Sequence, residues 1–90
     1  MQSRKFPVWR DDIDALTFQP DEHVGLCMVH RRAFRTLLRA MPSPRQCVEF
    51  FNVHQEAFQA AARAKLLRTK PVPIANFHLT SRDVTRQLKN

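Results

Sequence analysis

The sequence predicts one small domain of the α+β class over residues 1–90. Three observations favour this class. Short stretches of alternating apolar residues come first, and helical periodicity takes over near residue 31. A run at 45–70 contains neither Gly nor Pro. Apolar residues make up 43% of the chain, enough for a single core. We therefore expect a small antiparallel sheet of about four strands, with one long amphipathic helix and two shorter helices packed on one face.

Three strands are predicted before the first helix. The stretch 6–9 contains Pro7, which cannot donate a ladder hydrogen bond, so this stretch forms an edge strand or an extended anchor. The stretch 13–18 places its large apolar residues on one face. The stretch 23–30 alternates in the same way, and the connection of about four residues between the two suits a hairpin.

A short helix is predicted at 31–41, because the spacing of apolar residues changes there from the strand period to the helical period. Its apolar face consists of Phe34, Leu37, Leu38 and Met41. Pro42 and Pro44 then separate this helix from the next one at a sharp corner.

The long helix is predicted over 43–68. Ser43 is a suitable N-cap, Pro44 fits the first helical position, and Gln46 completes a capping box. The buried stripe of this helix consists of Cys47, Phe50, Phe51, His54, Ala57, Phe58, Ala61 and Ala64. Such a stripe is typical of an amphipathic helix that covers a core.

The length of this helix leaves two arrangements open. A straight helix over 43–68 would measure about 37 Å, whereas a compact domain of this size has a diameter of about 30 Å. Either the helix kinks, or its C-terminal end projects beyond the core. A projecting end would expose Ala61, Ala62, Ala64, Leu66 and Leu67. On that basis we predict a homodimer.

A last strand at 74–79 and a short helix at 81–89 complete the predicted fold. Thr80 is a candidate N-cap, with Asp83 at the third helical position as in a capping box. Four cations end the long helix, where they complement the helix dipole. They are Arg63, Lys65, Arg68 and Lys70.

Three segments form a pattern after the aromatic start at 6–9: LTFQP at 16–20, HVGLCMVHRRAFRTLL at 23–38 and FHLTSRDV at 77–84. This pattern resembles the small uncharacterised bacterial proteins of the family called domain of unknown function 1488. The resemblance covers most of the chain and implies a small α+β domain. It implies no assigned activity, and it carries no functional residues over to this sequence.

The charge balance points to an anionic partner. Lys and Arg number 15 against 8 Asp and Glu, which gives a formal net charge of +7. Five arginines lie on the predicted helix at 31–41 or just after it, and they are Arg31, Arg32, Arg35, Arg39 and Arg45. Guanidinium groups fit phosphate bidentately. We therefore predict anion or nucleic-acid binding through this arginine-rich helix.

Two alternatives stay open for these arginines. In the first alternative, the arginines form an ordinary solvated face that nearby acids neutralise, namely Asp11, Asp12, Asp14, Asp21 and Glu22. In the second alternative, the protein is a protein–protein adaptor or regulatory module that binds an acidic partner or forms a homodimer, with no nucleic-acid role. This adaptor alternative predicts an exposed apolar patch beside the basic face.

No pattern of residues indicates catalysis, so we expect a protein that is not an enzyme. Cys47 and His54 lie about 10 Å apart along a helix, too far for a nucleophile and its base. His23 and Cys27 share one face of a strand while His30 turns to the other, so we expect no metal site. Both cysteines are expected to be buried thiols.

The remaining expectations concern location and ligands. Gly25 is the only glycine, which excludes a Gly-rich phosphate loop. The N-terminus has no apolar run of signal-peptide length, and no segment approaches the roughly 18 apolar residues of a membrane span. We expect a cytoplasmic protein with no cofactor, no membrane partner and no small-molecule substrate.

Overall fold

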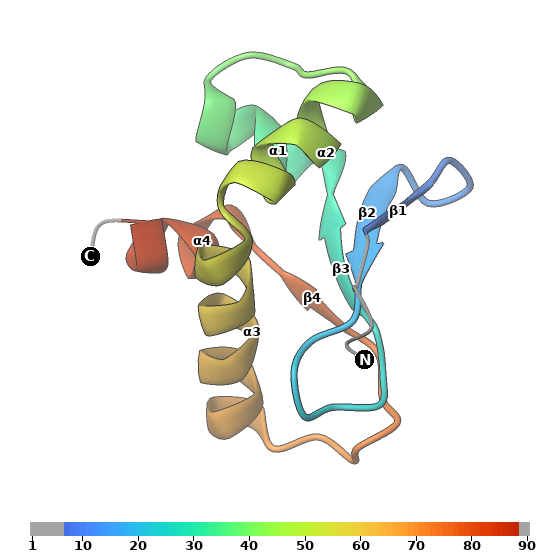
Figure 1. Ribbon diagram of the computed structural model, residues 1–90, viewed down its shortest axis with the longest axis vertical. Coiled ribbons are helices and arrows are strands. Elements are labelled where there is room, and N and C mark those ends of the chain that lie inside the picture. The colour runs from blue at the N-terminus through green and yellow to red at the C-terminus, as the bar shows by residue number, and fades with distance from the viewer. Residues whose placement is uncertain (1–6, 89–90) are drawn as a thin grey trace, which may run out of the picture.

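The computed structural model describes residues 7–88, which form a small α+β domain (Figure 1). Its elements are β1 (Val8–Arg10), β2 (Ala15–Phe18), β3 (Cys27–His30), α1 (Arg31–Leu38), α2 (Pro44–Val53), α3 (Gln55–Thr69), β4 (Phe77–Leu79) and α4 (Ser81–Leu88). The predicted fold class is confirmed. The predicted strand residue Phe6 and helix residue Lys89 lie outside the described range. No helix within 7–88 is both long and apolar enough to cross a membrane.

The strands form one sheet in the order β1-β2-β3-β4, so β1 lies at an edge as predicted. The pairs β1–β2 and β2–β3 are antiparallel, whereas β3 and β4 are parallel. The prediction of an antiparallel sheet is therefore wrong for the last pair. Between β3 and β4 the chain passes through α1, α2 and α3, and a long crossover of this kind joins parallel strands.

The helices gather on one side of the sheet, as predicted (Figure 1). The strands contribute Leu16, Phe18, Cys27, Val29, Phe77 and Leu79 to the core. The helices contribute Phe34, Cys47, Phe51, Phe58, Ala61, Ala62 and Val84. Because side chains alternate along a strand, Met28, His30 and His78 lie on the opposite face of the sheet.

Two loops replace part of the predicted strands. Residues 23–26 lie between β2 and β3, and residues 73–76 lie just before β4. These two segments, here called the loop pair, lie side by side. The strand predicted at 23–30 is therefore only four residues long, and the strand predicted at 74–79 only three. A turn before β2 shortens the strand predicted at 13–18 to four residues.

Hydrogen bonds join the loop pair. The N–H groups of Val24 and Gly25 both donate to the carbonyl of Pro73, at 3.1 and 3.0 Å. The ring of His23 bonds the carbonyl of Ala75 at 2.8 Å. These bonds satisfy backbone groups that have no partner in the sheet. They also hold the start of β4 beside the start of β3.

The long helix predicted at 43–68 is in fact two helices, α2 and α3, which meet at His54. His54 leaves the helical conformation with φ −116° and ψ 33°. Its N–H group donates to the carbonyls of both Phe50 and Phe51, at 3.1 Å each. Of the two predicted arrangements, the kink is present.

The break keeps both helices on the sheet. Phe51 of α2 and Phe58 of α3 both pack on Phe18 of β2, with ring centroids 4.9 and 6.3 Å from that of Phe18. A straight helix over 43–68 would measure about 37 Å, longer than the 33 Å greatest extent of the domain. Packing on the sheet therefore decides against the straight helix.

The projecting surface that motivated the homodimer prediction is absent from residues 7–88. Ala61 and Ala62 are buried in the core, and Ala64 and Leu66 are half-buried. Leu67 is exposed, at 69%. Of the two arrangements left open, the projecting end is thus not the one present, because the break turns α3 along the sheet. The homodimer itself stays a prediction.

Both predicted capping boxes are confirmed. The hydroxyl of Ser43 accepts from the N–H of Gln46 at 3.1 Å, and the hydroxyl of Thr80 accepts from the N–H of Asp83 at 3.2 Å. The carboxylate of Asp83 in return accepts from the N–H of Thr80 at 2.9 Å. These local bonds explain why α2 and α4 begin where they do.

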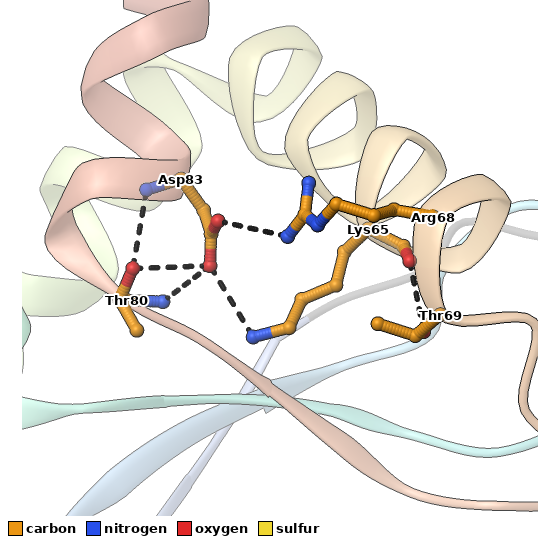
Figure 2. A network of polar contacts seen from close by, with 5 residues as sticks. All are labelled: Lys65, Arg68, Thr69, Thr80 and Asp83. Carbon is orange, nitrogen blue, oxygen red and sulfur yellow. Dashed lines mark hydrogen bonds and ion pairs between the residues drawn. The ribbon is translucent and has the colours of Figure 1, made fainter.

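Asp83 also joins α4 to α3 (Figure 2). Its carboxylate lies 3.3 Å from the ammonium group of Lys65 and 3.4 Å from the guanidinium group of Arg68. The side chain of Asp83 is only 10% exposed. Burial alone would raise its pKa, but hydrogen bonds from Thr80 and the charge of Lys65 outweigh burial, so the pKa of Asp83 lies below its usual value.

Replacing Asp83 with asparagine is expected to lower the free energy of unfolding at neutral pH by about 2 kcal/mol, because Lys65 loses its buried anion. The lowered pKa means that this contribution is complete above the ordinary carboxyl pKa. It is lost as the pH falls through the folded-state value. Urea denaturation from neutral to acid pH measures the effect, and the curves of the two proteins should converge in acid.

Asp12→Asn is the matched control for this variant. Asp12 also pairs with an arginine, Arg10, at 2.6 Å, but on the open surface. Exposed pairs contribute little, so this control should leave the free energy of unfolding unchanged. Equal effects of the two substitutions would contradict a special role for the bridge between α3 and α4.

Candidate partner-binding surface around helix α1

The exposed side of α1 differs from the predicted stripe. Arg31 turns to the flank of the helix, where its guanidinium group lies 3.6 Å from the carboxylate of Asp14. The Nε atom of Arg31 also lies 3.4 Å from the sulfur of Met41. The side chains exposed to solvent are those of Arg32, Arg35, Thr36 and Arg39. We call Arg32, Arg35 and Arg39 the α1 arginines.

One alternative left open by the sequence was that acids between Asp11 and Glu22 neutralise the arginines. On this helix only Arg31 is paired in that way, with Asp14. Within residues 7–88 the α1 arginines make no ion pair. Arg45 lies on α2 and pairs with Glu49, one helical turn later, at 3.3 Å. Three of the five predicted anion-binding arginines are therefore exposed without an acidic partner in this range.

Helix α1 ends three residues earlier than predicted. Its last residue is Leu38, and Arg39 adopts the left-handed conformation with φ 63° and ψ 23°. A left-handed residue is a common helix stop, although a residue other than glycine there costs roughly 1 kcal/mol. Met41 thereby leaves the predicted apolar face and is 52% exposed.

A groove of about 500 Å³ lies between the end of α1 and helix α2. Its apolar lining consists of Leu38, Ala40, Met41, Pro42, Phe50 and Val53, and its polar lining of Gln46, Glu49 and His54. Val53, on the last turn of α2, is 75% exposed. Arg39 adjoins this lining in the chain, and Arg45 pairs with Glu49 inside it. The adaptor alternative predicts such an apolar surface beside arginines.

A second hollow, of about 620 Å³, continues past the helix break. Val53 and His54 line both hollows, so these residues separate the two. The second hollow is mostly polar, with Asn52, Gln55 and Gln87 in its lining. An apolar centre with a polar rim is the usual arrangement of a protein–protein interface.

The other flank of α1 borders a different hollow, of about 340 Å³, at the start of α4. His30 and His78 line it, with their rings stacked at 4.9 Å between centroids and 14° between planes. Arg32 also contributes to the lining. Sequence reasoning missed His78, because only the parallel pairing of β3 and β4 brings it beside His30.

The residues weighed for metal binding or catalysis do not meet. The His23 ring bonds a backbone carbonyl, Cys27 is buried in the core, and His30 lies on the opposite face of the sheet. Within 7–88 no three His, Cys, Asp or Glu side chains are placed to hold a metal ion. Both cysteines are free and buried as predicted, and burial raises the pKa of Cys47 to about 11.

Comparisons with protein-family models, with curated proteins and with solved structures found no match for this chain. The resemblance to domain of unknown function 1488 therefore stays a prediction.

Proposed function

We propose that this protein is a binding module that docks an acidic amphipathic helix of another protein in the groove between α1 and α2. The observation that carries this proposal is the adjacency of two features. Exposed apolar side chains, Met41 and Val53, line a groove. Arg39 adjoins this groove in the chain and is exposed, with no acidic partner within residues 7–88. An amphipathic helix offers an apolar face for the groove and acids at its edges for Arg35 and Arg39.

The magnitudes assign different roles to the two features. Burying a side chain such as Met41 or Val53 contributes about 1.5–3 kcal/mol each. An exposed ion pair contributes only about 0–1 kcal/mol, and salt screens it. The groove therefore provides most of the affinity, while the arginines select acidic partners and accelerate encounter.

Nucleic acid is the competing ligand for the same arginines. Phosphates would engage the α1 arginines, and binding would weaken steeply with salt. A nucleic acid would leave the apolar groove unused, however. The one tryptophan, Trp9, lies on β1 and donates its ring N–H to Asp11 at 2.9 Å. The apolar groove thus favours an acidic protein segment over nucleic acid.

The test uses labelled synthetic helices of about 20 residues, a length that permits helix formation. They share one apolar face and carry either Glu or Lys along its edges. Fluorescence anisotropy should show binding of the Glu helix, and binding at least about tenfold weaker for the Lys helix. Short duplex and single-stranded DNA are titrated in parallel. Failure of the Glu helix to bind, or equal binding of both helices, would contradict the proposal.

Two variants separate the groove from the charge. Val53→Glu should weaken binding of the Glu helix by about tenfold or more. Val72→Glu is the matched control, because Val72 is 65% exposed but lies in the loop after α3. The double variant Arg35→Gln, Arg39→Gln should weaken binding of both the helix and any DNA.

Two results would replace the proposal. DNA binding that Val53→Glu leaves unchanged, without helix binding, would establish nucleic acid as the partner. Self-association in sedimentation that Val53→Glu abolishes would make the groove a homodimer interface.

A further inference from the structure

The hollow on the other flank of α1 lies where two parallel strands end. Strand β3 passes directly into α1 after His30, and β4 passes into α4 after Thr80. Because β3 and β4 are adjacent and parallel, their carboxyl ends meet at one edge of the sheet. Ligands of α/β proteins commonly bind outside the carboxyl ends of parallel strands. The hollow of about 340 Å³ occupies this edge.

Five polar side chains of this hollow are donors that lack acidic partners within residues 7–88. His30, Arg32, Thr36, His78 and Ser81 line it, and its lining contains no Asp or Glu. None of these five side chains has a hydrogen bond or ion pair to another residue within 7–88. The hydroxyl of Thr80, by contrast, is occupied by Asp83.

The charges around the two histidines favour an anion over a metal cation. The ring of His78 on β4 stacks on the ring of His30 on the adjacent strand β3, and Arg32 of α1 lines the same hollow. The charge of Lys65 on α3 also acts on His78, although Lys65 is paired with Asp83 at 3.3 Å. Asp14, in the adjoining hollow, is paired with Arg31. Asp83, which bonds Thr80 of this hollow's lining, is paired with Lys65 and Arg68. Burial lowers the pKa of His78, and the charges of His30 and Lys65 lower it further. A bound anion would relieve this repulsion.

We propose that this hollow binds a phosphomonoester or free phosphate dianion, held by Arg32 and by the ring N–H groups of His30 and His78. The guanidinium fork of Arg32 suits two phosphate oxygens, and the hydroxyls of Thr36 and Ser81 supply further donors. None of these residues lines the groove between α1 and α2, so this site is independent of the proposed helix docking.

The binding is coupled to protonation. A dianion favours the charged form of the neighbouring rings, so phosphate raises the pKa of His78. By linkage, the affinity for a phosphomonoester rises as the pH falls toward about 6, where the ester itself takes up a proton. The relevant charged neighbours are His30 on β3, Arg32 on α1, the Lys65–Asp83 pair between α3 and α4, and the Arg31–Asp14 pair.

The test is an NMR titration of the full chain with inorganic phosphate, following the ring C–H signals of His30 and His78. Saturable shifts of both signals and a raised pKa of His78 are expected, with sodium chloride at equal ionic strength as the reference. Arg32→Gln should weaken phosphate binding by about tenfold. Arg39→Gln is the matched control, because Arg39 is also an exposed arginine but adjoins the other flank of α1.

Several results would overturn the site. These are shifts that chloride reproduces, equal weakening by Arg32→Gln and Arg39→Gln, or ring signals that respond to zinc ions and not to phosphate. The ligand's source is resolved by further titrations with a phosphoserine peptide and a phosphodiester dinucleotide. Tightest binding of the peptide assigns the site to phosphorylated protein, and tightest binding of inorganic phosphate assigns it to the free ion. Equal binding of the diester would overturn the monoester assignment.

Discussion

Gly25→Ala is expected to lower the free energy of unfolding by about 3 kcal/mol or more, although Gly25 has an ordinary negative φ. The reason is space. A Cβ at this position would overlap the backbone of Ala75 and come within 2.9 Å of the carbonyl oxygen of Ile74. Both neighbours are backbone atoms, so no flexible side chain can move aside to accommodate the methyl group.

Separation of the loop pair would break several hydrogen bonds together. The bonds from Val24 and Gly25 to Pro73 would lengthen, as would the bond from the Phe77 N–H to the Leu26 carbonyl at 3.0 Å. The last of these begins the pairing of β4 with β3. The variant should therefore show a lower urea midpoint and faster hydrogen exchange at Phe77.

Val24→Ala is the control for this substitution. Val24 is the preceding residue, and its side chain is exposed, so removal of its methyl groups should change the urea midpoint little. If Gly25→Ala were as stable as the parent within about 0.5 kcal/mol, the two loops could not lie as close together in solution as the structure places them.

Phe58→Ala is expected to lower the free energy of unfolding by about 4 kcal/mol, the usual cost of removing a buried aromatic ring. Phe58 is fully buried at the centre of the aromatic cluster. Its ring centroid lies 5.0 Å from that of Phe51, 5.9 Å from Phe34, 6.1 Å from Phe50 and 6.3 Å from Phe18. A chain of 90 residues has a total stability of about 5–13 kcal/mol. The substitution should therefore remove a large share of it.

Urea denaturation of two further variants makes this result specific. Phe58→Leu should cost much less than Phe58→Ala, because the larger side chain fills part of the cavity. Leu67→Ala on the same helix is the exposed control and should cost little, since Leu67 is 69% exposed. Equal effects of Phe58→Ala and Leu67→Ala would contradict the packing of α3 against the sheet.

The part of the surface that could be predicted from the sequence is the identity of the arginines. Their positions relative to partners could not be predicted, because Arg31 meets Asp14 only after the turn before β2 has formed. The groove also depends on the helix stop at Arg39, which exposes Met41. Left-handed backbone at an arginine has no signal in the sequence, since glycine or asparagine is the usual residue there.

The sequence by itself determined the features that depend on neighbours in the chain. The capping boxes at Ser43 and Thr80, the alternation in β3, and the phenylalanine stripe through Phe51 and Phe58 all follow from spacings within one or two turns or along one strand. Such interactions involve few residues and have fixed spacings, so a pattern in the sequence suffices to locate them.

Only the tertiary structure decided the helix break at His54, the parallel direction of β4 and the bridge from Asp83 to Lys65. No Gly or Pro lies near His54, and the weak helix formers Asn52, Val53 and His54 each cost at most about 0.7 kcal/mol in a helix. The break arises because Phe51 and Phe58 must both reach Phe18, which lies far from them in the chain. Contacts between distant segments gain their free energy only once the whole core has assembled, so no local pattern encodes them.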